Sequence, residues 1–328
     1  MEKSLDVKLE KIRKGTYRPS DFIIADAKDG DMGGGITAFG SVPGGSGRSV
    51  SFPAHLQAMR EMTETGLVDI MLMSSLATER LVGEGAFKKS SVTPAARLND
   101  TTDIWGPRHS VYKAGAARNF RTARIDNLEE LVDLGLYSIT FSNDLERDLD
   151  SLEQFQVFLD ELCDSNLRYF LEIFNPQIDI GIDAGGLPEY VNDCIVRCLA
   201  GLTRADQPQF LKMPFNGPKA MEEICQYDPG NLIVGVLGSG VNTTRDTLEY
   251  IRQSEKYGAR VALFGRKILF TEDPIEIVRM LRAVIQGEIG TEEAVKAYHA
   301  HLGKKGVMPF RSLEDDQKIV DPALFHDL

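Results

Sequence analysis

Short apolar runs alternate along the chain with longer segments whose apolar residues recur every three or four positions. The short runs are rich in Val, Ile, Leu and Phe at consecutive positions, as expected of strands that are buried on both faces. We predict eight such strands: FIIADA from Phe22, VDIMLM from Val68, VTPAARL from Val92, YSITF from Tyr137, YFLEIF from Tyr169, FLKMPF from Phe210, LIVGVLG from Leu232 and VALFG from Val261.

The segments between the strands have the period of amphipathic helices, for example SLEQFQVFLDELC and DPIEIVRMLRAVIQG. Strict alternation of strand and helix predicts a parallel sheet, and eight such units predict closure into one (β/α)8 TIM barrel. The alternative is a doubly wound open sheet, but no G-x-G-x-x-G follows a strand. We expect a single domain over 1–328, with an N-terminal extension at 1–20, the barrel at 21–287 and a C-terminal helix and tail at 288–328.

Several features extend this minimal barrel. The first 20 residues predict a helix over one end of it, and long inserts follow the first strand (29–53, rich in Gly and Ser) and the third strand (99–124). Long loops in compact domains are often lids or binding loops, although a merely mobile loop is equally consistent with the composition. Glycines follow the last periodic residue of several predicted helices, where a left-handed C-cap is expected: Gly66, Gly135, Gly201 and Gly258.

Composition narrows the range of functions. The net charge of −12 gives no sign of the basic face that a nucleic-acid-binding protein needs. No apolar run reaches 18 residues and no secretory signal is recognisable, so we expect a cytoplasmic protein with no membrane partner. The four cysteines show no zinc-site spacing, so we expect structural thiols and no metal or cofactor.

Polar residues inside apolar strands are the candidate catalytic residues, because inward side chains near the C-terminal ends of barrel strands build the active site. Lys212 lies in FLKMPF, Glu172 in the neighbouring YFLEIF and Asp26 in FIIADA. Burial lowers the pKa of a lysine and favours the neutral amine that attacks a carbonyl, and carboxylates beside it can move the protons. The alternative interpretation is a buried ion-pair network without catalytic function.

The last two predicted strands indicate a phosphate site. In TIM barrels the loops after strands seven and eight often bind phosphate, and glycine lets the backbone approach an anion closely. The candidate phosphate-binding residues are Gly238, Ser239, Gly240, Gly265 and Arg266. Lys28, Arg97 or Arg121 could supply further positive charge for the substrate, although each is more typical of a surface or loop residue.

With these residues in place, the sequence resembles the class I, Schiff-base aldolases, the group of the tagatose-bisphosphate, archaeal-type fructose-bisphosphate and deoxyribose-phosphate aldolases. The shared pieces are the Asp of IIADA, the LEI of strand five, the LKMP of strand six, the LGSGV of strand seven and the GR of strand eight. The resemblance extends from Phe22 to Gly287 and is strongest from Tyr169 to Lys267.

The resemblance implies reversible aldol cleavage of a phosphorylated ketose in carbohydrate metabolism, such as glycolysis, with dihydroxyacetone phosphate and an aldehyde as products. It implies Lys212 as the Schiff-base lysine, Glu172 as its acid/base partner and Asp26 as a second carboxylate. It also implies a homo-oligomer. One departure is Thr140, which we align with a second active-site lysine of the bisphosphate aldolases. A barrel isomerase, or a sugar-phosphate-binding regulator with weak turnover, is therefore an alternative.

Overall fold

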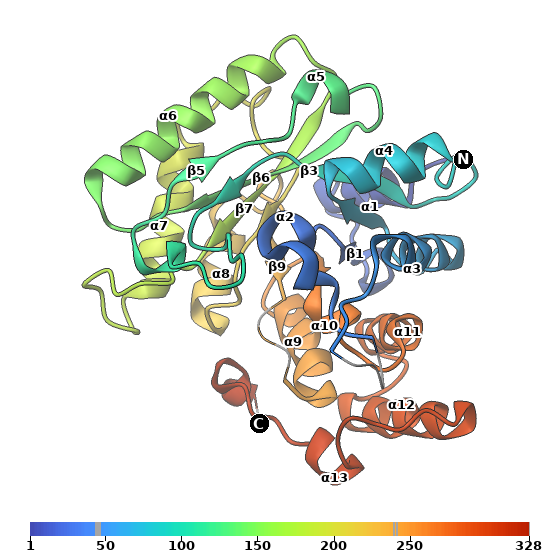
Figure 1. Cartoon of the computed structure of the whole chain (residues 1–328). Coiled ribbons are helices and arrows are strands. Elements are labelled where there is room, and N and C mark those ends of the chain that lie inside the picture. The colour runs from blue at the N-terminus through green and yellow to red at the C-terminus, as the bar shows by residue number, and fades with distance from the viewer. Residues whose placement is uncertain (43–46, 239, 241, 328) are drawn as a thin grey trace.

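Eight parallel strands form one sheet in the described residues 1–42, 47–238, 240 and 242–327 of this computed structural model, and they are the eight predicted from the sequence (Figure 1). Their order is β8-β7-β6-β3-β2-β1-β10-β9. The two ends of this order meet, because Met213 pairs with Val236 and the Leu211 N–H donates to the Ile233 carbonyl at 2.8 Å. The predicted (β/α)8 barrel is confirmed. Its strands are β1 Ile23–Ala27, β2 Ile70–Met73, β3 Thr93–Arg97, β6 Leu134–Thr140, β7 Arg168–Phe174, β8 Leu211–Lys212, β9 Gly235–Leu237 and β10 Val261–Phe264.

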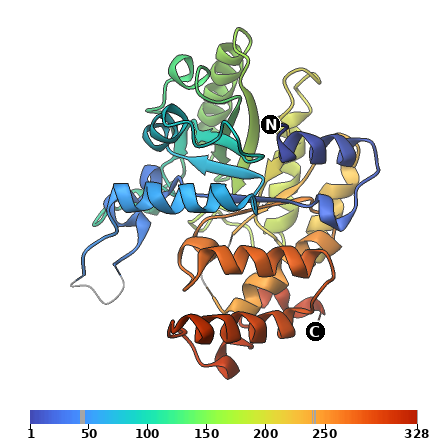
Figure 2. The ribbon, with the colours of Figure 1, turned by 90° about the vertical axis from the view of Figure 1, so that its right-hand side faces the viewer.

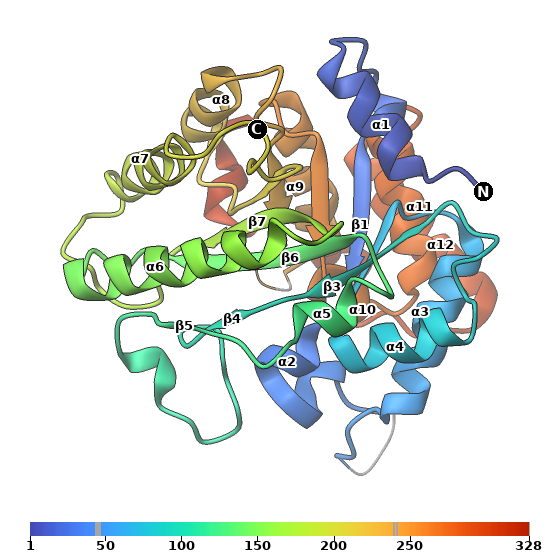
Figure 3. The same ribbon diagram turned by 90° about the horizontal axis from the view of Figure 1, so that it is seen from above.

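Helices surround the sheet (Figure 3). They are α1 Ser4–Arg13, α2 Gly30–Gly34, α3 Phe52–Thr65, α4 Ser75–Gly83, α5 Ile125–Leu128, α6 Leu145–Leu162, α7 Leu187–Leu199, α8 Pro218–Tyr227, α9 Thr244–Lys256, α10 Arg266–Leu269, α11 Pro274–Ile285, α12 Thr291–Lys305 and α13 Leu313–Asp316, with 3-10 turns η1 Pro19–Asp21, η2 Gly35–Phe39, η3 Tyr112–Ala114 and η4 Pro322–Asp327. Among the described residues, no helix is both long and apolar enough to cross a membrane.

The interior of the barrel is a compact apolar cluster. Inward residues such as Ile23, Leu72, Leu136 and Phe170 pack there, while the opposite faces of the strands pack against the helices. Helix α1 adds Leu5, Leu9 and Ile12 to the interior cluster, so it closes the N-terminal end of the barrel as predicted. Figure 3 shows α1 and α2 at opposite ends of β1, and Figure 2 shows the same separation from another side, so α1 lies at the N-terminal end and the first insert at the C-terminal end.

The glycine prediction is correct at some positions and wrong at others. Gly66 and Gly258 follow α3 and α9 with φ of +64° and +110°. Gly135 does not cap a helix: it lies inside β6, where an added Cβ would come 2.3 Å from Leu98 Cδ1. Gly201 follows α7 without a positive φ among the described residues. The close approach of a neighbouring side chain, and not helix termination, therefore requires glycine at 135.

Both predicted inserts lie at the C-terminal end of the strands. The first contains α2 and η2. The second forms a short antiparallel pair of β4 (Asp100–Thr101) and β5 (Asn119–Phe120), and Trp105 stacks on Tyr112 with ring centroids 4.7 Å apart. At the other end of the chain, α12, α13 and η4 lie against α9 and α11 (Figure 1), where Thr244 N–H donates to Asp316 at 2.8 Å.

Candidate active site

A cavity of about 730 Å³ opens at the C-terminal ends of the strands. Its wall includes Lys212, Glu172 and Arg97 from the barrel. It also includes residues of both inserts, among them Phe39 from the first and Lys113 from the second. Inward positions of the strands thus carry charge at this end, whereas their earlier inward positions are apolar. A cavity of this size fits a small molecule.

Lys212 and Glu172 form the centre of the site. They are paired in the register of β7 and β8, and Lys212 Nζ lies 2.5 Å from Glu172 Oε1. Lys212 is 6% exposed and Glu172 1%. The sequence prediction that neighbouring strands bring this amine and this carboxylate together agrees with the structure. A carboxylate in direct contact with an amine can accept the proton that the amine must lose before it acts as a nucleophile.

The residue of β6 beside Glu172 is Ser138. The β6–β7 register pairs Ser138 with Glu172, and the Ser138 hydroxyl donates to Glu172 Oε2 at 2.8 Å. Thr140, which we aligned with the second lysine of the aldolases, lies two residues further on, and its hydroxyl is 3.3 Å from Asp103. Because Glu172 is in turn paired with Lys212, the β6 residue in register with the Lys212 amine is Ser138. Our alignment had placed Thr140 at that position.

Arg97 connects the carboxylates of the site. It is buried, and its guanidinium lies 2.7 Å from Asp29, 2.8 Å from Asp100 and 3.6 Å from Glu172. It also donates to the Ser138 hydroxyl at 3.3 Å. Burial alone would lower the pKa of Arg97, but the neighbouring carboxylates raise it overall. Arg97 lines the cavity and is not at the surface, but its donors are already engaged with the protein.

The first strand supplies a different carboxylate from the one expected. Among the described residues, the cavity wall takes Ala27, Lys28 and Asp29 from this segment and not Asp26. Ala25 and Ala27 face the barrel interior, so Asp26 lies on the other face of β1, fully buried, 3.2 Å from Lys28. Burial raises the pKa of Asp26. The prediction that Asp26 projects into the mouth of the barrel is therefore wrong, and the carboxylate that this segment contributes to the cavity is Asp29.

Asp29 is held in its ionised form. Burial would raise its pKa, but the charges of Arg97 and Lys212, with the Arg97 hydrogen bond, lower it overall. Asp29 and Lys212 both line the cavity, which therefore holds a second carboxylate in addition to Glu172. No sequence pattern singled out Asp29, because it follows the strand, where the two-residue alternation no longer applies.

His55, from the first turn of α3, is a further residue that sequence reasoning did not select. It is 2% exposed, lines the cavity and stacks on Phe39 with centroids 3.8 Å apart. Its Nε2 lies 3.0 Å from the Lys28 carbonyl, which can only accept, so Nε2 carries the proton. Burial lowers the pKa of His55 to about 4, which makes the ring neutral at pH 7.

The predicted phosphate-binding residues are only partly gathered at this cavity. Gly238, Gly265 and Arg266 line it together with Lys212. Gly265 is required by a close approach, since an added Cβ would lie 2.9 Å from the Ala27 carbonyl oxygen. Gly240 is exposed and outside the wall, and Ser239 lies outside the described residues. Arg266 is exposed and forms no ion pair within the described chain, so its guanidinium is available to an anion.

Other candidates lie away from this site. Arg121 pairs with Glu161 at the surface through two contacts of 2.6 Å. The four cysteines are free, and burial raises the pKa of Cys198 and Cys225 to about 12, so these thiols are poor nucleophiles. Within the described residues, no group of three or more His, Cys, Asp or Glu side chains is placed to hold a metal ion.

The ionisation of Asp100 provides a test of this electrostatic description. Its contact with Arg97 is favourable, but burial and the charges of Asp29 and Glu172 outweigh that contact and raise its pKa to about 6. A raised folded-state pKa means that stability is lost as pH rises through about 4 to 6. Asp100→Asn should therefore raise the free energy of unfolding at pH 7.5 by about 1–3 kcal/mol, and by less at pH 5. Urea unfolding at both pH values measures this.

The control is Asp126→Asn, which changes an exposed carboxylate 3.7 Å from the exposed Arg124. Its effect should be small at both pH values, because exposed ion pairs contribute little. A loss of stability in Asp100→Asn at pH 7.5 would show that the Arg97 contact dominates.

These features define a (β/α)8 barrel with a buried lysine–glutamate pair at the C-terminal end of its strands. No known family model and no curated protein sequence matches the chain. Solved structures do: an archaeal fructose 1,6-bisphosphate aldolase has a TM-score of 0.62 at 14% identity, covering 86% of this chain and 99% of that one. Fructose-bisphosphate aldolase from Slackia heliotrinireducens has a TM-score of 0.63 at 11% identity, covering 90% of each chain.

A third similar structure is an archaeal fructose-1,6-bisphosphate aldolase whose catalytic lysine is covalently bound to the carbinolamine intermediate of its substrate. Its TM-score is 0.61 at 15% identity, and the match covers 86% of this chain and 99% of that one. At these identities the likeness establishes an aldolase-like barrel fold, which is the fold that the sequence resemblance implied.

Proposed function

We propose that this protein is a class I aldolase that cleaves and forms a carbon–carbon bond in a phosphorylated ketose through a Schiff base on Lys212. The observation that supports this most directly is the buried amine of Lys212, in contact with Glu172, at the floor of a cavity that also contains Arg266. The similar fold of aldolases in which a lysine carries the intermediate adds to the proposal.

The residues present can perform each step. Glu172 takes a proton from Lys212, and the neutral amine adds to the ketose carbonyl to give a carbinolamine. Glu172 returns the proton to the departing hydroxyl, so that water leaves and a protonated imine forms. Asp29, ionised beside Lys212, stabilises that cation. Glu172, which is a carboxylate again once water has left, then takes the proton of the substrate's C4 hydroxyl. This breaks the C3–C4 bond, which releases an aldehyde and leaves an enamine on the lysine.

Substrate orientation follows from the other wall of the cavity. Arg266 and the backbone at Gly238 and Gly265 hold a phosphate, because a guanidinium and close-approaching backbone suit an anion. The proposed substrate is thus a ketose phosphate, with dihydroxyacetone phosphate as the ketone product.

Borohydride trapping tests the proposal. The protein is incubated with dihydroxyacetone phosphate and a panel of phosphorylated ketoses, reduced, and analysed by intact mass and peptide mapping. We expect a substrate-sized mass increase on Lys212. The mapping must separate this peptide from those of Lys28 and Lys113, which also line the cavity.

An adduct on Lys28 in place of Lys212 would show that Lys28 is the nucleophile, which would contradict the proposal. Absence of any adduct, while one of these ligands still raises the melting temperature by binding the folded state, would favour the isomerase or the binding protein.

A further inference from the structure

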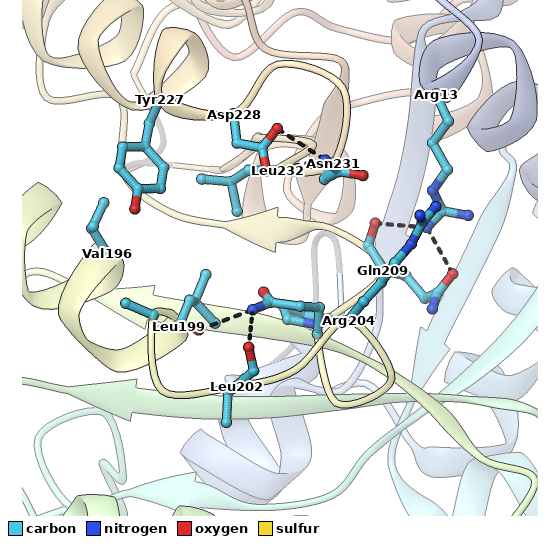
Figure 4. Close-up of a pocket in the computed structure, with 13 residues that line it drawn as sticks. Arg13, Val196, Leu199, Leu202, Arg204, Gln209, Tyr227, Asp228, Asn231 and Leu232 are labelled. Atoms are coloured by element: carbon cyan, nitrogen blue, oxygen red, sulfur yellow. Dashed lines mark hydrogen bonds between the residues drawn. The ribbon is translucent and has the colours of Figure 1, made fainter.

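A second cavity, of about 500 Å³, precedes β8 and β9 and so lies at the opposite end of the barrel from the candidate active site. Figure 4 shows it in close-up. It is formed where α1 ends, where α7 leads into β8 and where α8 leads into β9. Gln209 and Leu232 line it, and both precede the strands on which the active-site residues lie. Its volume is in the range of small-molecule sites.

One end of this cavity is cationic. Figure 4 shows Arg13 and Arg204 on the same side, with Arg13 donating to the side chain of Gln209 at 3.0 Å. Within the described chain, neither arginine has a carboxylate oxygen within 4.0 Å, although the protein carries 49 acidic residues against 37 basic ones. Burial and then the charges of Arg168 and Arg204 lower the pKa of Arg13, so the two guanidinium groups repel each other.

The other end is apolar. Val196, Leu199 and Leu202 lie across the cavity from the arginines, and the Tyr227 ring, 60% exposed, stands beside them (Figure 4). Asp228 also lines the cavity, but its carboxylate accepts from the Asn231 amide at 3.0 and 3.1 Å. The cavity therefore offers two convergent guanidinium groups at one end and an aromatic and aliphatic wall at the other.

We propose that this cavity binds a phosphate monoester that carries an aromatic ring, such as a nucleoside monophosphate, with the phosphate between Arg13 and Arg204 and the ring against Tyr227. Guanidinium groups bind phosphate through paired donors, and the ring gains by covering the exposed Tyr227 and the aliphatic side chains beside it. Such a ligand joins α1 to the segment that leads into β8, the strand of Lys212. It therefore stabilises the closed N-terminal end of the barrel, and this site is separate from the proposed catalytic cavity.

Isothermal titration calorimetry with AMP, adenosine and inorganic phosphate at constant ionic strength tests this proposal. We expect saturable binding of AMP, and binding at least about tenfold weaker for adenosine and for phosphate alone. Arg204→Gln and Tyr227→Ser should each weaken AMP binding about tenfold or more. Arg204 is exposed and has no protein partner within the described residues, so its substitution leaves the fold intact.

Two controls locate the binding. Arg197→Gln changes an exposed arginine of α7 that does not line the cavity, and it should leave AMP affinity unchanged. Arg266→Gln should also leave it unchanged, because Arg266 lies in the other cavity. The proposal would be overturned if Arg266→Gln lost AMP binding, or if Arg204→Gln bound AMP as tightly as Arg197→Gln does. It would also be overturned if the protein bound inorganic phosphate as tightly as AMP.

Discussion

Replacing Lys212 with methionine should lower turnover of the trapped ketose phosphate by about four orders of magnitude or more, because no other group then forms the imine. Reductive trapping should disappear in the same variant. Methionine has a similar length, and Glu172 keeps the Ser138 hydroxyl at 2.8 Å and Arg97 at 3.6 Å. The carboxylate keeps these two partners but loses its nearest cation, so the variant should fold with a lowered melting temperature. Steady-state kinetics, trapping and thermal unfolding measure the three effects.

Two further lysine variants make this test specific. Lys212→Arg keeps the positive charge but cannot form an imine, so it should be as inactive as the methionine variant. Lys219→Met removes an exposed lysine whose ion-pair partner is Glu189, and it should retain full activity. Substantial turnover in Lys212→Arg would mean that Lys212 acts only as a charge, as in the isomerase alternative.

The barrel was predictable from the sequence because its strands are buried on both faces. All eight predicted runs coincide with strands of the sheet, and α1 covers one end of the barrel, as expected of the first 20 residues. Lys212 and Glu172 were identified for the same reason, since a charged residue is conspicuous within an apolar run. Their contact follows from the adjacency of β7 and β8, which the order of the predicted strands already implied.

The same apolar character hides which way a side chain points. In FIIADA both faces are apolar, so nothing in the run distinguishes the inward Ala25 and Ala27 from the outward Asp26. Asp29 comes after the end of β1, where side chains no longer alternate between the two faces of the sheet. Ser138 lies beside Glu172 because of the register between β6 and β7. The sequence of one strand does not determine how it is aligned with its neighbour.

The inserts were located but their contributions were not predictable. Their Gly-rich and irregular sequences have no periodicity, so the placement of Phe39 on His55 or of Trp105 on Tyr112 depends on tertiary packing. Arg97 could be predicted only in part. Its place in the third predicted strand was consistent with a role at the mouth of the barrel, but its ion pairs with Asp29 and Asp100 depend on residues that follow β1 and β3.

Arg97→Met should destabilise the fold by about 3–5 kcal/mol at pH 7.5, the cost expected when one partner of a buried ion-pair network is removed. The variant leaves Asp29, Asp100 and Glu172 buried near one another without the guanidinium that contacts all of them. The pKa of Asp29 should then rise, because Arg97 is what lowers it most against the effect of burial. Part of the loss should therefore be recovered at pH 5, where protonation removes the repulsion. Urea unfolding at pH 7.5 and pH 5 measures both effects.

A second substitution separates this charge effect from a simple loss of packing. In Arg97→Met/Asp29→Asn, one uncompensated carboxylate is removed, so the double variant should be more stable than Arg97→Met alone at pH 7.5. Arg121→Met is the control: it removes an arginine with two contacts of 2.6 Å to Glu161 near the surface, and it should cost no more than about 1 kcal/mol at either pH. If the Arg97→Met loss is the same at both pH values and the second substitution adds to it, the lost van der Waals contacts of Arg97 account for its role. If the double variant recovers stability, the positive charge of Arg97 is what permits several carboxylates to remain ionised around Lys212.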